Sequence, residues 1–174
     1  MKVIILILFF LTSTLNIAHA ECNFKIKLGQ KISKIKKFTD INQEDDLLLE
    51  NYYISTEDIC PNENLEDTDI NYTFINDKLA SIRLIVKNDK SNTASNKLLL
   101  MKYVKQNYGN FDTGQNSKIY NYFNSWKNND EIIIYKRIKD QFEIIDEELF
   151  ITNEENNEKL MKINAKIEKG EIKG

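Results

Sequence analysis

The chain has 174 residues, and its 24 Lys and Arg side chains stand against 27 Asp and Glu, which gives a formal net charge of −3 at pH 7. This mild negative charge argues against general attraction to nucleic acid, so we expect no nucleic-acid partner. The one histidine, His19, lies in a segment that we expect to be removed. Without an imidazole, the mature chain lacks Ser–His–Asp and Cys–His catalysis and the usual zinc sites. The five glycines form no G-x-G pattern, so we predict no cofactor and no metal.

Residues 1–20 predict a cleavable signal peptide. Lys2 provides the positive start, Val3 to Leu11 is an unbroken apolar run, and Ala18-His19-Ala20 places small residues where signal peptidase cuts. The apolar run is too short to cross a bilayer, which takes about 20 residues. No later segment is as apolar, so we expect no transmembrane segment after cleavage. The mature protein should therefore be periplasmic or secreted.

The remaining segment is long enough to form one compact domain. We divide it into a single α+β domain over residues 21–152 and a C-terminal helix and tail over residues 153–174.

Both cysteines lie in the mature part. Because exported chains fold in an oxidising compartment, Cys22 and Cys60 predict one structural disulfide. Its closed loop would stabilise the fold by about 4 kcal/mol in the chain-entropy model. Redox-active pairs usually stand two residues apart, which makes that alternative the weaker one. Lipid attachment at Cys22 is disfavoured because Glu21 precedes it.

The N-terminal third predicts mixed structure. Phe24, Ile26 and Leu28 alternate with polar residues, as in a half-buried strand that Gly29 ends. Residues 31–37 suit a short helix, residues 39–46 a loop, residues 48–53 a second strand, and residues 57–68 an acidic loop around Cys60.

The middle of the chain predicts a hairpin followed by a helix. Ile70, Tyr72 and Phe74 alternate up to the turn pair Asn76-Asp77, and alternation returns from Ala80 to Val86. A helix is expected over residues 93–108, with Gly109 just beyond its end.

The last third predicts three more strands, at residues 118–126, 132–138 and 142–151, and then a helix. Thr152 and Glu155 have the spacing of a capping box, and Leu160, Ile163 and Ile167 form a thin apolar stripe. Glu155–Lys159 and Glu158–Lys162 are spaced for ion pairs along this helix.

These elements predict an α+β fold. We expect an antiparallel β-sheet of about six to seven strands, with one long helix packed across it, a short N-terminal helix and a C-terminal helix. The helices are expected on one face of the sheet.

Three constellations suggest chemistry, each weakly. Ser33 and Lys36 have the S-x-x-K spacing of penicillin-recognising enzymes, but the companion motifs are missing. Glu143, Asp146, Glu147 and Glu148 could supply the carboxylate pair of a glycosidase, yet none stands in apolar surroundings. Asp67, Asp69 and Asn71 start a calcium-loop pattern that then fails. We therefore predict no catalytic residue.

Aromatic residues are the remaining binding candidates. Alternation places Tyr120, Tyr122 and Trp126 on one face of their strand, and Tyr135 lies in the next one. These four residues form the candidate ligand-binding aromatic face, with a place in the core or at its rim as the alternative.

The sequence favours a small, non-catalytic binding or assembly protein of the cell envelope, with another envelope protein as a candidate partner. A hydrolase that uses carboxylates or a Ser–Lys pair on cell-wall or polysaccharide substrate is the alternative. A second alternative is an inhibitor-like module that docks on another exported protein.

Overall fold

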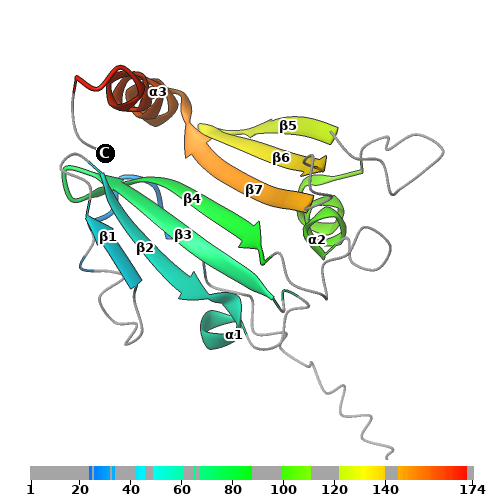
Figure 1. Ribbon diagram of the computed structural model, residues 1–174. Helices are drawn as coiled ribbons and strands as arrows, with labels where there is room; N and C mark the ends of the chain where they lie inside the picture. Colours follow the sequence, from blue (N-terminus) through cyan, green and yellow to red (C-terminus); the bar gives the residue numbers. More distant parts are fainter. Residues whose placement is uncertain are drawn as a thin grey trace, which may run out of the picture.

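The structure is a computed structural model that describes residues 24, 26–31, 33, 42–45, 49–60, 65, 67–87, 99–110, 122–139 and 145–171. Its strands form one antiparallel sheet of seven, in the order β1-β2-β3-β4-β7-β6-β5 (Figure 1). The strands are β1 (Asn42–Asp45), β2 (Glu50–Ser55), β3 (Thr68–Ile75), β4 (Lys78–Val86), β5 (Tyr122–Asn128), β6 (Glu131–Lys139) and β7 (Ile145–Asn153). The helices are α1 (Thr56–Ile59), α2 (Leu99–Tyr108) and α3 (Glu154–Glu168). The predicted α+β class with an antiparallel sheet is confirmed.

The predicted hairpin is β3 and β4. Asn76 and Asp77 form its turn with φ angles of 51° and 62°. Both values lie in the left-handed region that a tight two-residue hairpin turn requires, and Asn and Asp tolerate this region better than most residues. The register shifts between Thr73 and Phe74, where β4 carries one extra residue, Ala80, in a bulge.

The N-terminal part differs from its prediction. Phe24 is fully buried, and Ile26 and Leu28 pack against the same core, so the alternation was right about burial. The described residues of this segment form turns and a single bridge from Lys31 to Lys78 rather than a strand. The predicted helix over 31–37 lies almost wholly outside the described residues. Strand β1 falls inside the predicted loop of residues 39–46, and the one-turn helix α1 lies at the start of the predicted acidic loop.

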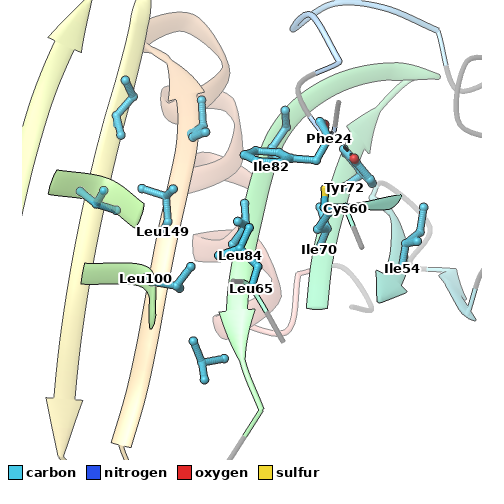
Figure 2. Packing of buried hydrophobic residues seen from close by; sticks show 14 of the residues in the cluster. Phe24, Ile54, Cys60, Leu65, Ile70, Tyr72, Ile82, Leu84, Leu100 and Leu149 are labelled. Carbon is cyan, nitrogen blue, oxygen red and sulfur yellow. Dashed lines mark hydrogen bonds between the residues drawn. The ribbon is translucent and has the colours of Figure 1, made fainter. Parts of the chain in front are cut away.

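Alternation along each strand gives the sheet two distinct faces. The inner face carries the apolar core, to which Ile54, Ile70, Tyr72, Leu84 and Leu149 belong (Figure 2). Helix α2 covers this face through the buried side chains Leu100, Met101 and Val104. The Tyr72 hydroxyl donates a hydrogen bond to the carbonyl oxygen of Phe24 at 2.7 Å, which ties the N-terminal segment to the core.

Helix α3 packs on the opposite, outer face, so the prediction that the helices share one face is wrong. Leu160 of α3 lies against Leu49 and Ala80 in a second, smaller apolar cluster that includes Phe150 and Ile163. The cause is geometric: β7 leads directly into α3, and the outward residues at this end of the sheet are apolar enough to receive the thin stripe of the helix. Figure 1 shows α2 and α3 lying apart at the two sides of the sheet.

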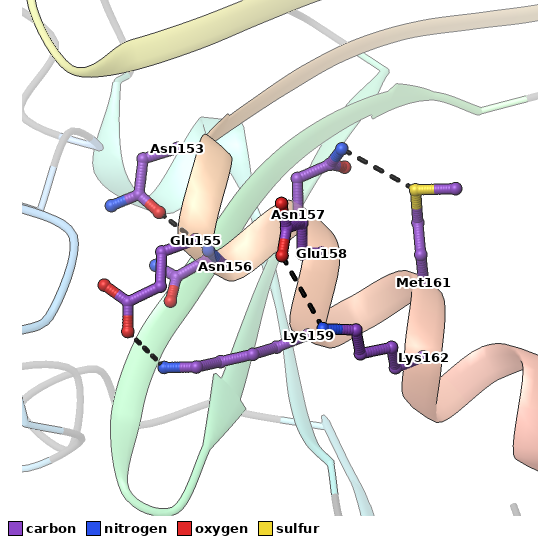
Figure 3. Close-up of polar contacts among 8 residues, drawn as sticks. All are labelled: Asn153, Glu155, Asn156, Asn157, Glu158, Lys159, Met161 and Lys162. Carbon is purple, nitrogen blue, oxygen red and sulfur yellow. Dashed lines mark hydrogen bonds and ion pairs between the residues drawn. The ribbon is translucent and has the colours of Figure 1, made fainter.

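The start of α3 is one residue later than the predicted capping box. Asn153 is the N-cap, and its side-chain oxygen accepts a hydrogen bond from the backbone N–H of Asn156 at 2.9 Å (Figure 3). Thr152 belongs to β7 and donates instead to the carbonyl oxygen of Ala80 at 2.8 Å. The predicted ion pairs Glu155–Lys159 and Glu158–Lys162 are both present. Within the described ranges, no helix is long and apolar enough to cross a membrane.

Candidate functional site: a polar groove beneath the C-terminal helix

Polar side chains gather on the outer face of β2, β3 and β4. The strand register places Asn51 beside Thr73 and Thr73 beside Ser81, so these three residues form one row across the sheet. The next row runs from Tyr53 through Asn71 and Arg83 to Phe150. We call these two rows the groove floor. Polar residues can occupy these two rows because successive side chains of a strand point to opposite faces, and the apolar residues at every second position point into the inner core.

The groove floor is polar but buried. Asn71 is 3% exposed, Thr73 is 8% and Ser81 is 2%. The Thr73 hydroxyl lies 2.8 Å from the Asn51 side-chain oxygen and 3.0 Å from that of Asn71. A hydroxyl has one hydrogen and can donate to only one of the two. The other amide can donate its N–H to the hydroxyl oxygen, or it can turn toward a bound molecule.

Helix α3 forms the wall above this floor. Leu160 fixes the helix to the sheet, and the hollow between them is lined on the helix side by Asn157, Met161, Asn164 and Ile167. Asn157 turns its amide nitrogen toward the Met161 sulfur at 3.8 Å, a weak contact between two of these lining residues (Figure 3). The volume of the groove is about 380 Å³, within the range of small-molecule sites, roughly 300–1,000 Å³.

Among the described residues that line the groove, Arg83 is the one that carries a charge. Its Nε lies 3.1 Å from Glu148, and its guanidinium stacks over the Phe150 ring at 5.2 Å. Glu148 also contacts Lys136 at 2.9 Å. Glu148 thus offsets part of the positive charge of Arg83, and the other described lining residues offer only uncharged groups.

Two further hollows adjoin the turns at the ends of the strands. The larger, of about 400 Å³, lies beside the first turn of α3 and includes Gly29, Asn76 and Lys78. The other lies around the β5–β6 turn at Asn129 and Asp130. These residues are exposed, and neither hollow has a buried polar floor. We therefore take the groove beneath α3 as the candidate site.

A second polar cluster lies on the inner face, closed off under α2. Glu147 is fully buried, and its Oε1 accepts hydrogen bonds from the Tyr135 hydroxyl at 2.8 Å and from the backbone N–H of Met101 at 3.1 Å. Arg137 is also fully buried and stands opposite Glu147 in the strand register. Figure 1 shows α2 lying against this end of β7.

The protonation of this cluster follows from its burial. Burial raises the pKa of the Glu147 carboxyl, while the hydrogen bond from Tyr135, the charge of Arg137 and the backbone N–H groups of Met101 and Leu100 oppose the rise. Burial and the neighbouring carboxyl raise the pKa of Tyr135 as well, which keeps its hydroxyl protonated as a donor. The cluster joins the first turn of α2 to β6 and β7, and it has no exposed surface through which a substrate could reach it.

The candidate aromatic face is divided by the structure. Tyr135 is fully buried, whereas Tyr122 and Trp126 are half-buried on the same inner face. Tyr122 lies 6.5 Å from the Tyr135 ring, and Trp126 lies 6.1 Å from the Tyr108 ring of α2. Tyr120 lies outside the described residues. A ligand at the surface could therefore reach Tyr122 and Trp126 but not Tyr135, while Phe123 on the outer face is 63% exposed.

The candidate carboxylates are not brought together. Glu147 points into the core and Glu148 to the outer face, because neighbouring residues of a strand face opposite ways. Asp146 is exposed, and Glu143 lies outside the described residues. Two acids on opposite faces cannot flank one bond.

The remaining candidates are equally scattered. Ser33 is exposed in a short turn, and Lys36 lies outside the described residues. Asp69 pairs with Lys87 at 3.1 Å, and Asn71 belongs to the groove floor. In the part of the chain that the structure describes, no three His, Cys, Asp or Glu side chains gather as a metal site.

Cys60 lies in the inner core at 4% exposure, next to α1 (Figure 2). Phe24 is buried in the same cluster, only two residues beyond Cys22, which lies outside the described residues. The described ranges contain no free cysteine. The pairing of Cys60 with Cys22 stays a prediction.

Sequence reasoning missed the residues of the groove floor. Asn71, Thr73 and Ser81 alternate with core residues, which is the ordinary pattern of a wet sheet face. One signal in the sequence could have found them. The helix that follows the last strand has only a thin apolar stripe, and this stripe must pack against apolar residues on the outer face of the sheet.

No protein-family model matches the chain, and neither the curated proteins nor the solved structures contain a match to it.

Proposed function

We propose that this protein is an exported, non-catalytic binding or assembly module of the cell envelope that holds its ligand in the groove beneath α3. The buried polar floor carries the proposal. The middle of this floor presents hydroxyl and amide groups to an open groove, where a ligand can form hydrogen bonds with them. Export rests on the signal-peptide pattern of residues 1–20.

The absence of accessible acid–base chemistry in the groove supports binding rather than turnover. Its described lining residues include no carboxylate, and their one cation, Arg83, pairs with Glu148, which also contacts Lys136. The carboxyl whose pKa burial raises, Glu147, lies on the other face of the sheet under α2. A general acid or base must reach its substrate within hydrogen-bond distance.

Blocking the groove should abolish binding without unfolding the protein. Asn164 lines the groove yet is exposed on α3, so Asn164→Trp should fill the hollow at little cost in stability. Ala165 is exposed on the same helix and does not line the groove, which makes Ala165→Trp the matched control. Protein purified from its native envelope, followed by mass spectrometry of what is bound, should show the same bound species for wild type and Ala165→Trp. Asn164→Trp should lose it, and equal recovery by both variants would refute the groove as the binding site.

Export should leave a defined N-terminus. Cleavage after Ala20 predicts a mature chain that begins at Glu21. Intact-mass measurement of the periplasmic or secreted protein should give the mass of residues 21–174. A retained Met1, or a lipid adduct on Cys22, would show that the segment is not a simple cleavable signal.

The disulfide should contribute substantially to stability. Replacing Cys60 by Ser should lower the free energy of unfolding by roughly 2–5 kcal/mol, because the unfolded chain regains the freedom that the closed loop removed. Alkylation without reductant should label neither thiol of the exported protein. Labelling of both thiols in the folded, exported protein would contradict the pairing of Cys22 with Cys60.

A further inference from the structure

The groove carries hydrogen-bonding groups that the fold itself does not use. The Ser81 hydroxyl is at the groove floor on a residue only 2% exposed, and it has no hydrogen-bond partner within the described part of the chain. The side-chain oxygen of Asn71 lies 3.0 Å from the Thr73 hydroxyl, which can donate its one hydrogen either to Asn71 or to Asn51. Ser81 and Asn71 both line the open groove, where a bound molecule can form hydrogen bonds with them.

From these groups we propose that the groove binds a neutral carbohydrate, a mono- or disaccharide unit. This inference rests on the proposed binding function and names the chemical class of its ligand. A side-chain amide presents a donor and an acceptor side by side, and two neighbouring sugar hydroxyls present the complementary pair. Asn51 and Asn71 on the floor and Asn157 and Asn164 on the helix supply four such amides around one hollow.

The apolar parts of the groove suit the carbon-bound faces of a sugar ring. Tyr53 and Phe150 stand at the two ends of one floor row, and Leu160 and Met161 come from the helix. Aromatic rings offer flat apolar area at low entropy cost. Arg83 contacts Glu148 and the Phe150 ring, and the other described lining residues are uncharged, which suits a ligand without net charge.

A peptide fits the groove less well. Extended peptides usually bind by adding a strand to an open sheet edge, where main-chain groups are unpaired. Here the floor is made by β2, β3 and β4, and each of these strands is paired on both sides. The floor offers side chains rather than main-chain groups.

The test titrates the exported protein with uncharged disaccharides, namely cellobiose, maltose and N,N′-diacetylchitobiose, and with a neutral tripeptide amide, by calorimetry. At least one disaccharide should bind at millimolar concentration or below. Ser81→Ala should weaken that binding about tenfold, as expected for one lost hydrogen bond to the ligand. Ser125 is exposed on β5 and does not line the groove, so Ser125→Ala should bind as wild type does.

Thermal unfolding separates a binding role from a structural one. Because the Ser81 hydroxyl has no partner in the described fold, Ser81→Ala should leave the melting temperature unchanged or raised while binding falls. A failure of every disaccharide to bind overturns the inference, and so does equal binding by Ser81→Ala. Binding of the tripeptide alone would overturn the carbohydrate class and leave the proposed function standing. The proposed function itself falls only if Asn164→Trp also retains the native bound species.

Discussion

Replacing Glu147 by alanine should lower the free energy of unfolding by at least about 3 kcal/mol. Glu147 accepts hydrogen bonds from Tyr135 and from the backbone N–H of Met101, and all its atoms are buried. Removing it leaves two buried donors without their acceptor, each at a cost of roughly 1–3 kcal/mol. It also opens a cavity beside the buried Arg137. Urea denaturation of the two proteins at neutral pH measures the difference.

The matched variant is Glu147→Gln, which keeps an acceptor oxygen but cannot ionise. It should lose much less stability than the alanine variant. Because burial raises the pKa of Glu147 above its ordinary value of 4.5, the folded state holds the proton more tightly than the unfolded state. The stability of wild type relative to Glu147→Gln should therefore be greatest below pH 4.5 and should decline as pH rises through the raised pKa. A relative stability that increased over this range would contradict a raised pKa.

Deleting residues 156–174 should abolish binding in the groove while the remaining chain still unfolds cooperatively. Of the stripe on α3, only Leu160 is buried, whereas Ile163 and Ile167 are half-buried. Complete burial of a residue such as leucine contributes roughly 1.5–3 kcal/mol, so losing α3 should cost a few kcal/mol and leave the inner core intact. The same deletion removes Asn157 and Asn164 and with them one wall of the groove.

Calorimetric unfolding and ligand titration of the truncated protein test both parts. A chain ending at Gly170 keeps the whole of α3 and serves as the control. It should bind and unfold as the full chain does. Loss of cooperative unfolding on truncation at residue 156 would show that α3 is part of the core rather than an attached wall.

The elements that were predictable are those whose signal is local. Asn76-Asp77 between two alternating runs determines a hairpin within a few residues, and the predicted turn has the φ angles that such a pair tolerates. The C-terminal helix was predictable from its charge spacing and stripe. Its cap was misplaced by one residue because Thr152 and Asn153 are both good N-caps, and only the hydrogen bond from Thr152 to Ala80 decides between them.

What could not be predicted depends on strands that are distant in the sequence. Alternation says that Asn71 and Ser81 face away from Tyr72, but not that a helix from the end of the chain will cover them. In the same way, Glu147 and Glu148 looked equivalent as a pair of surface acids. Glu147 became a buried helix contact and Glu148 a half-buried ion-pair partner on the outer face. Which of the two is buried depends on which face of the sheet meets α2, and this depends on the pairing of β7 with β4.

The pairing between β4 and β7 links occupancy of the groove to the lifetime of the folded protein. Only Ile82–Ile85 of β4 pairs with Glu148–Ile151 of β7, whereas β6 pairs with β7 over the whole of Glu131–Lys139. Strands β1 to β4 form one half of the sheet and β5 to β7 the other, and pairing within each half joins strands that are neighbours in the sequence. Pairing β4 with β7 instead closes a long loop of chain. This step is slow because the entropy cost of closing the loop precedes the contacts that stabilise it. Helices α2 and α3 each contact both β4 and β7, from opposite faces. A molecule held between α3 and Arg83 or Phe150 would rest on this join, so occupancy of the groove would slow the separation of the two halves and lengthen the lifetime of the folded protein.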